Sequence, residues 1–317
     1  KGKVVDIIIK RMTSFAQLSL FTIEYSVKSI NFAGNIRFDS YHEGEVLNYC
    51  NPNDPRVAGE HFVHILPEKI EMEGETSYIT SSTARSGLKI CTGVTNQLSK
   101  VAKSNLNKEE NRVIATLDTT IQENETITLI KYTVFADSIR DKECKSKAVS
   151  EMKNALNLSL KKLYKQQREY LKAYWENSFI KIDGDSDLNL AVNYNLYQLI
   201  QSVGKDEHCN IAAKGLSGEG YEGHYFWDTE MYILPYFILT NPTVAKNLLE
   251  YRYKTLDLAR ENARLLGHKK GALYPWRTIM GKECGGYFPS GSAQYHINGD
   301  IAYAITSYYL ATKDVDF

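Results

Sequence analysis

The sequence has 317 residues, 43% of them hydrophobic and 24% charged, a composition typical of a globular protein with room for about two domains. Basic and acidic residues number 38 each, so the net charge is zero and indicates neither a nucleic-acid-binding surface nor an anionic membrane as a partner. No apolar segment is long enough to span a bilayer as a helix.

Residues 1–140 carry the pattern of an antiparallel β domain. Six short segments are rich in β-branched and aromatic residues and are separated by turn residues: 4–9, 20–27, 34–41, 74–82, 111–121 and 125–135. Ile36 and Phe38 alternate with Arg37 and Asp39, as in a half-buried strand. One helical pattern interrupts the series. Many short strands joined by polar turns predict a β-sandwich.

A change of period follows the strands. Between Lys145 and Trp175, apolar residues recur at helical spacing, at Met152, Leu156, Leu160, Leu163, Tyr170, Leu171 and Tyr174. The opposite face is rich in lysine, and we expect it to be solvated. We interpret this segment as a helical connection between two domains.

From Asp187 onward the chain is predicted to be mainly helical. One apolar stripe runs through 188–200, a second helix begins at Asn241-Pro242 and continues to Ala263, and a third covers 297–310. Two long loops rich in glycine and aromatic residues, 204–226 and 267–295, connect these helices. Helices in series with such loops predict an α/α toroid whose loops build a site at one end.

The first loop leads into a segment that places Trp227, Asp228 and Glu230 among large apolar residues. Buried carboxylates without partners are costly, so these acids need a partner or a ligand. The residues alone leave two interpretations open. In one, Asp228 caps a helix that begins at Thr229, and Trp227 and Phe226 are part of the core. In the other, the segment faces a ligand, which the glycines of the loop allow to approach the backbone closely.

The second loop combines aromatic residues, among them Trp276 and Tyr287, with a few polar side chains, namely Arg277, Lys282, Glu283, Gln294 and His296. Aromatic faces that stack and polar groups that form hydrogen bonds suit a sugar. In the competing interpretation, Glu283 forms an ion pair with Arg277 or Lys282, and His296 is a capping or core-edge histidine.

The five cysteines are widely spaced and form no CxxC pair and no metal-binding spacing. An odd number of scattered cysteines is typical of reduced thiols in a cytoplasmic protein. Cys284 has no evident residue beside it that would activate the thiol, so we expect it to be inert.

The chain contains a long, ordered set of motifs: "NFAGNIRFDSYHEG" near its start, then "GHYFWDTEMYILPYFILTNPTVAKNLLEYRYKTLDLARENA", "KGALYPWRT", "GKEC" and "SAQYHINGDIAYAI". In these motifs and over its whole length it resembles glycoside hydrolase family 65, which contains the inverting disaccharide phosphorylases. The resemblance implies a β-sandwich in residues 1–143, a helical linker in 144–183 and the first part of an (α/α)6 barrel in 184–317.

Members of that family are longer than this chain. The resemblance therefore implies that the first part of the sandwich and the remainder of the barrel are missing from it. Apolar helix faces that the missing barrel would cover favour aggregation. We expect residues 1–317 alone to be poorly soluble and inactive.

Trp227 and Asp228 match a Trp-Asp pair of the family. The resemblance implies that they line the subsite for the transferred glucosyl unit, with Asp228 accepting hydrogen bonds from sugar hydroxyls. No catalytic residue is assigned within the chain, because the family's general acid is a glutamate in a motif that is expected beyond Phe317.

Glu283 and the 284–295 loop match the region that shapes the acceptor subsite of the family. Gln294, Trp276 and Arg277 are further candidate substrate-binding residues in this region. Inorganic phosphate is implied as a co-substrate, with no cofactor and no metal. The implied partners are a disaccharide, phosphate and a second copy of the chain in a homodimer, without nucleic acid or membrane.

The activity implied by the resemblance is inverting phosphorolysis of an α-linked glucose disaccharide to β-glucose 1-phosphate and glucose. Phosphate is already an anionic nucleophile, whereas an inverting hydrolase needs a second carboxylate to activate water. The segment "AQYHIN" favours kojibiose as the substrate. Phosphorylases of trehalose, nigerose or glucosylglycerol, a family 65 hydrolase and a non-catalytic carbohydrate-binding fragment are the alternatives.

Overall fold

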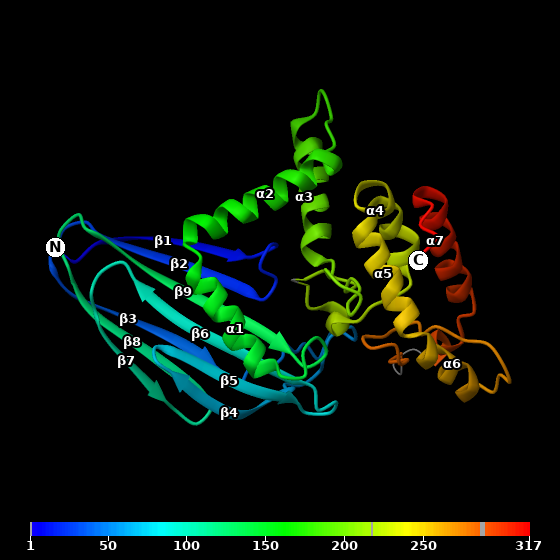
Figure 1. The fold of residues 1–317 in the computed structure, drawn as a ribbon, viewed down its shortest axis with the longest axis horizontal. Helices are drawn as coiled ribbons and strands as arrows, with labels where there is room; N and C mark the ends of the chain where they lie inside the picture. The colour runs from blue at the N-terminus through cyan, green and yellow to red at the C-terminus, as the bar shows by residue number, and fades with distance from the viewer. Residues whose placement is uncertain (1, 217, 286–288) are drawn as a thin grey trace. The chain divides into compact units, whose positions relative to one another are not determined.

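The computed structural model describes residues 2–216, 218–285 and 289–317 (Figure 1). The chain divides into two compact units. The sandwich unit comprises Lys1–Asn48 and His61–Leu171, and the helical unit comprises Tyr49–Glu60 and Lys172–Phe317. The proposed boundaries of the helical linker at 144 and 183 stay a prediction.

The sandwich unit contains two antiparallel sheets in its described residues. The larger sheet has the order β1-β2-β9-β6-β5-β4 and the smaller sheet the order β3-β8-β7. The strands are β1 (Val5–Thr13), β2 (Leu20–Ser29), β3 (Gly34–Glu43), β4 (Ile65–Glu73), β5 (Thr76–Thr83), β6 (Lys89–Leu98), β7 (Lys103–Lys108), β8 (Arg112–Ile121) and β9 (Thr126–Asp137). The predicted antiparallel β-sandwich is confirmed.

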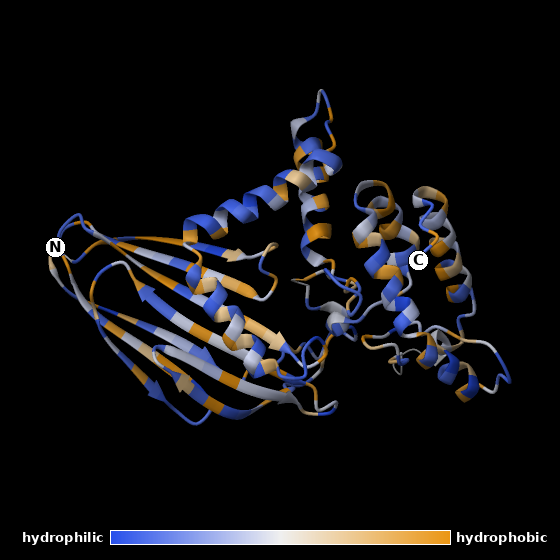
Figure 2. Cartoon of the chain, viewed as in Figure 1, coloured by the Kyte–Doolittle hydropathy of each residue, from blue (hydrophilic) through white to orange (hydrophobic). Residues whose placement is uncertain are grey.

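The alternation of side chains along β9 gives the larger sheet two buried faces. Ile127 and Leu129 join the core that also contains Phe38 of β3 and Leu117 of β8. Farther along the strand the even-numbered residues, such as Val134, join a second core with residues of α1 (Cys144–Asn157). Successive residues of a strand point to opposite faces, so one strand can serve both cores. Figure 2 shows the resulting mixture of apolar and polar residues along the strands.

Three strands lacked a recognisable pattern in the sequence. β7 reads KSNLNK and carries one apolar residue, and β4 contains Pro67 next to an irregularity in its pairing with β5. β6 contains Gly93, where an added Cβ would lie 2.7 Å from the ring of Tyr78 and 2.9 Å from Val134. That glycine is required by close packing and breaks no strand. The helical pattern expected within residues 1–140 is wrong, because the structure describes no helix between β1 and β9.

The long helical segment after the strands is divided into two helices. α1 ends at Asn157, and α2 (Leu160–Ser178) begins after Ser159. The Ser159 carbonyl accepts hydrogen bonds from the backbone amides of Lys162 and Leu163, at 2.8 and 3.1 Å. Ser159 therefore starts a new helix at a residue type that favours helix N-termini.

The helical unit continues with α3 (Ser186–Ser202), η1 (Gly220–Gly223), η2 (Thr229–Ile233), α4 (Leu234–Thr240), α5 (Pro242–Lys254), α6 (Leu256–Leu265), η3 (Pro289–Ala293) and α7 (His296–Thr312). The first and third predicted helices correspond to α3 and α7. The second is divided at Thr255, whose hydroxyl donates to the Tyr251 and Arg252 carbonyls at 3.0 and 3.1 Å. No helix among the described residues is long and apolar enough to cross a membrane.

Candidate functional site

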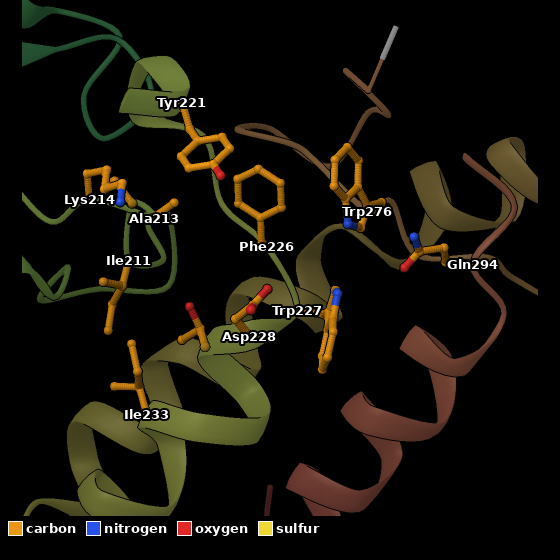
Figure 3. Close-up of a pocket in the computed structure, with 12 residues that line it drawn as sticks. Ile211, Ala213, Lys214, Tyr221, Phe226, Trp227, Asp228, Ile233, Trp276 and Gln294 are labelled. Atoms are coloured by element: carbon orange, nitrogen blue, oxygen red, sulfur yellow. The ribbon is translucent and has the colours of Figure 1, made fainter. Parts of the chain in front are cut away.

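A cavity of about 510 Å³ lies in the helical unit (Figure 3). It is lined by Ile211, Ala212, Ala213, Lys214, Tyr221, Phe226, Trp227, Asp228, Thr229, Ile233, Trp276 and Gln294. Of the residues expected to bind substrate, Trp227, Asp228, Trp276 and Gln294 are brought together here from three separate segments. A cavity with mainly apolar walls and a few polar groups is typical of a small-molecule site.

Asp228 occupies the position before η2, a five-residue turn of π-helix, but its carboxylate makes no capping hydrogen bond. The side chain is exposed and lies beside the Trp227 ring in the cavity (Figure 3). The capping interpretation of Asp228 is therefore wrong. Turns of π-helix occur frequently at functional sites, where they change the direction in which side chains point.

Aromatic rings build one wall of the cavity. Phe226 packs edge-on against both Tyr221 and Trp276, with ring centroids 5.3 and 5.2 Å apart. Phe226 is buried, as the core interpretation expected, but it also contributes to the wall. Trp227 is half-buried and lies edge-on to His296 at 4.7 Å. The cavity thus offers flat apolar faces close to one carboxylate.

His296 connects two elements of the site. Its Nδ1 lies 2.6 Å from a carboxylate oxygen of Asp300 and its Nε2 lies 3.0 Å from the side-chain amide of Gln294. A carboxylate accepts hydrogen bonds, so Nδ1 donates to Asp300 and the ring is held in one orientation. His296 therefore supports both Gln294 and Trp227, beyond the core-edge role that the sequence allowed.

Glu283 does not line the cavity. Its carboxylate accepts hydrogen bonds from the backbone amides of Trp276 and Gly285, each at 2.7 Å, and of Arg277 at 3.3 Å. The expected ion pair of Glu283 with Arg277 or Lys282 is wrong, because the carboxylate is used to organise the backbone of its own loop. Residues 286–288, which belong to the predicted acceptor region, lie outside the described residues.

Arg277 is also absent from the cavity lining but acts on a residue that belongs to it. Its guanidinium pairs with Glu222 at 3.1 Å and donates to the Tyr221 carbonyl at 3.4 Å. Tyr221 and Glu222 both have left-handed backbone conformations, with φ of 65° and 52°, which cost energy for residues other than glycine. The Tyr221 amide donates to the Arg56 carbonyl. Arg277 and Arg56 thus hold a strained turn that presents the Tyr221 ring.

Tyr221 and Lys214 are lining residues that sequence reasoning did not single out. The Lys214 ammonium lies 6.0 Å from the centroid of the Tyr221 ring. The sequence gives little indication that these two residues line a cavity. Both lie within the glycine-rich segment 214–223, and glycines indicate a turn without identifying which neighbouring side chain enters a cavity.

Glu230 has a different environment from Asp228. It is 1% exposed and forms a two-pronged ion pair with Arg252 of α5, with both N–O distances 2.8 Å. Asn210 donates to the same carboxylate at 3.0 Å. Burial alone would lower the pKa of Arg252, but the charge of Glu230 and its hydrogen bonds outweigh this and raise the pKa above its ordinary value. Of the two acids in this segment, one is neutralised inside the protein and the other faces the cavity.

No group of three or more His, Cys, Asp or Glu side chains that could hold a metal ion lies together in the ranges the structure describes. The polar side chains that line the cavity include a carboxylate, a lysine, an amide and the hydroxyl-bearing side chains of Tyr221 and Thr229. This set can form hydrogen bonds with a polyhydroxylated ligand whose apolar faces contact the aromatic rings.

Comparison with known proteins identifies the class. Residues 1–174 match the N-terminal domain of glycosyl hydrolase family 65, and residues 193–317 match the central catalytic domain of that family. The chain belongs to glycosyl hydrolase family 65, and the cavity lies in the part that matches the catalytic domain.

Individual relatives extend this assignment. The chain is 43% identical to an α,α-trehalose phosphorylase of Geobacillus stearothermophilus, over all of this chain and 41% of that protein. It is 32% identical to a kojibiose phosphorylase of Halothermothrix orenii, over all of this chain and 43% of that protein. A solved structure from the human microbiome, provisionally named a kojibiose phosphorylase, matches with a TM-score of 0.88 and 25% identity over the whole chain and 41% of its own. The chain spans less than half of the length of these relatives.

Proposed function

We propose that the protein catalyses inverting phosphorolysis of an α-linked glucose disaccharide, releasing glucose and β-glucose 1-phosphate. The observation that carries the proposal is the position of Asp228, an exposed carboxylate in a cavity with an aromatic wall, in the part of the chain that matches the catalytic domain. Similarity to trehalose and kojibiose phosphorylases supports the reaction type.

In this proposal the described residues bind and orient the glucosyl unit. Asp228 accepts hydrogen bonds from sugar hydroxyls, and hydrogen bonds to an ionised acceptor are stronger than neutral ones. Trp227 and Trp276 bound the apolar faces of the ring. Gln294, held by His296, supplies an amide that can donate and accept toward a second hydroxyl.

The reaction requires a proton on the glycosidic oxygen and a nucleophile at the anomeric carbon. An acid donates the proton as the bond to the leaving glucose breaks, and a phosphate oxygen attacks from the opposite face, which inverts the configuration. The family resemblance implies a glutamate for this role, and we assign that acid to no residue of this chain. Phosphate takes the position that water and its activating carboxylate would occupy in an inverting hydrolase. The reaction needs no cofactor.

Trehalose and kojibiose are the two candidate substrates. The identity of 43% to a trehalose phosphorylase, against 32% to a kojibiose phosphorylase, favours trehalose. The segment 293–298, which contains Gln294 at the cavity, resembles the kojibiose type. We therefore propose trehalose as the first candidate substrate and kojibiose as the second. Homodimer formation and a cytoplasmic location remain part of the proposal.

The test is release of glucose 1-phosphate by the intact protein, with and without inorganic phosphate, from trehalose, kojibiose, nigerose and maltose in parallel. We expect phosphate-dependent release from one disaccharide, with the β anomer as product. Release of free glucose at the same rate without phosphate would identify a hydrolase and overturn the proposal. Inactivity on all four, with the protein folded, would leave a carbohydrate-binding role.

A further inference from the structure

The buried pair of Arg252 and Glu230 lies directly behind the cavity wall. The Arg252 guanidinium holds the Glu230 carboxylate through two hydrogen bonds and also donates to the Phe226 carbonyl at 3.2 Å. Phe226 and Glu230 flank the short segment that contains Trp227 and Asp228. One side chain of α5 therefore fixes both ends of the segment that presents these two residues to the cavity.

The same network reaches the opposite wall. Asn210 donates from its side-chain nitrogen to Glu230 at 3.0 Å, while its side-chain oxygen accepts from the backbone amide of Ile211 at 2.7 Å. Ile211 lines the cavity. Three separate segments, around 210, around 228 and in α5, are thus joined through one carboxylate.

If the pair served only to stabilise the fold, its burial would carry a high free-energy cost. Arg252 and Glu230 are both about 1% exposed, and removing two charges from water costs more than a pair of this kind commonly returns. The Nη1 atom of Arg252 is buried and has no hydrogen-bond partner among the described residues. A well-packed apolar pair would avoid both costs, but it could not form hydrogen bonds with the Asn210 amide and the Phe226 carbonyl.

We propose that Arg252 and Glu230 are positioning residues that hold Trp227 and Asp228 in the orientation required to bind the glucosyl unit. This inference rests on the proposed function for its ligand. Neither residue lines the cavity, so neither is expected to touch the sugar.

The test separates positioning from stability with the double variant Glu230→Gln/Arg252→Met in the intact protein. It removes both charges, keeps an amide oxygen for Asn210 and removes the donor to Phe226. Replacing a buried ion pair by well-packed hydrophobic residues of similar volume is often neutral for stability, and here both charges are removed together so that neither is left buried and unpaired. We expect an unchanged unfolding midpoint together with disaccharide affinity about a hundredfold weaker, since small misplacements of binding groups have effects of that size.

A second readout needs no ligand. The intact protein is labelled with 5-fluorotryptophan. Of the three tryptophans in residues 1–317, Trp227 and Trp276 line the cavity and Trp175 does not. Fluorine NMR of the ligand-free double variant should show a displaced Trp227 resonance and an unchanged Trp175 resonance. Each resonance is assigned by Trp→Phe substitution.

The matched control is the ion pair of Lys254 and Glu207, which joins the same helix α5 to the loop around 207. Its N–O distance is 2.6 Å, but the pair is partly exposed and neither residue lines the cavity. The double variant Glu207→Gln/Lys254→Gln should keep wild-type affinity and the wild-type Trp227 resonance.

Arg252→Lys is measured in parallel, because a lysine keeps the charge but lacks the forked geometry that binds Glu230 and Phe226 together. The inference is overturned if either folded variant keeps both wild-type affinity and the wild-type resonance, or if both variants unfold, which would make the pair a requirement for folding. A wild-type protein that binds no disaccharide would refute the proposed function, while the Trp227 resonance would still test the positioning.

Discussion

The two units bury polar side chains in different ways. In the sandwich unit, His42 of β3 is 6% exposed, and its ring nitrogens lie 2.8 Å from the Ser77 hydroxyl and 2.7 Å from the Thr92 hydroxyl. These contacts join the smaller sheet to β5 and β6 of the larger one, and every partner is neutral. In the helical unit, Arg252 and Glu230 are charged, and their neighbours line a cavity.

The difference indicates what each cluster is for. A neutral, fully hydrogen-bonded cluster costs little to bury and fixes how two sheets face each other. A charged pair costs more, but it holds its partners with stronger and more directional bonds. The costlier cluster lies behind the cavity wall, where we propose that it holds the binding residues in place. Four predictions test this contrast, from the largest expected effect to the smallest.

Arg252→Met alone should destabilise the helical unit by about 3–5 kcal/mol, because it leaves the Glu230 charge buried without its partner. Hydrogen exchange measured by mass spectrometry resolves the two units: amides of α5 should exchange faster, while those of β9 should not change. Adding Glu230→Gln should restore most of the protection. A single variant as well protected as the double variant would show that the charge of Glu230 is not held by Arg252.

Acid should weaken the sandwich unit through His42. Burial, and then the positive charge of Lys131, lower the pKa of His42 from 6.5 to about 4. The unfolded chain binds a proton below pH 6.5, but the folded unit does not until about pH 4, so the unfolding free energy falls as the pH decreases across this window. The full loss is on the order of 3 kcal/mol.

The control for this prediction is His42→Gln, which cannot titrate. Protection of β3 and β9 amides is compared at pH 7, 5.5, 4 and 3 in both proteins. The difference between wild type and variant should shrink as the pH falls and level off below pH 4. A difference that is independent of pH would show that His42 takes up its proton over the same pH range in the folded unit as in the unfolded chain.

The sequence predicts those features of the fold that depend on neighbouring residues better than those that depend on residues far apart in the chain. Alternation within one strand is local, and Phe38 is buried while Arg37 and Asp39 are exposed, as the pattern predicts. β7 was missed because its polar sequence owes its strand conformation to pairing with β8. The breaks at Ser159 and Thr255 were missed because the apolar stripes continue through both residues.

The candidate site shows the same limit. The sequence identified Trp227 and Asp228, because the resemblance is carried by consecutive residues, and the structure brings both into one cavity. It could not identify the partner of Glu230, since Arg252 lies 22 positions away and several arginines occur in the same region. The tertiary fold decides which side chains from distant segments form pairs, and a single sequence does not reveal these pairs.

Asp228→Asn should reduce kcat/KM for the disaccharide by roughly tenfold to a hundredfold, because a hydrogen bond to a charged acceptor contributes about 1.5–3 kcal/mol. Stability should not change, since the carboxylate is exposed and makes no capping hydrogen bond. The matched control is Asp257→Asn in the first turn of α6, an exposed acid outside the cavity. Equal activity of both variants would show that Asp228 does not contribute to substrate binding.

The smallest effect is expected at an exposed polar contact of the helical unit. Asp185 caps α3 by accepting a hydrogen bond from the Leu188 amide at 2.8 Å, and Asp185→Ala should cost about 1 kcal/mol in unfolding free energy. Asp185→Asn should cost less, because asparagine caps helices nearly as well. Neither variant should alter disaccharide affinity, measured by titration of the folded proteins. If the loss of this cap weakened binding as strongly as the loss of the buried pair, the cavity would respond to the stability of the unit as a whole, and no special role would remain for the charges behind its wall.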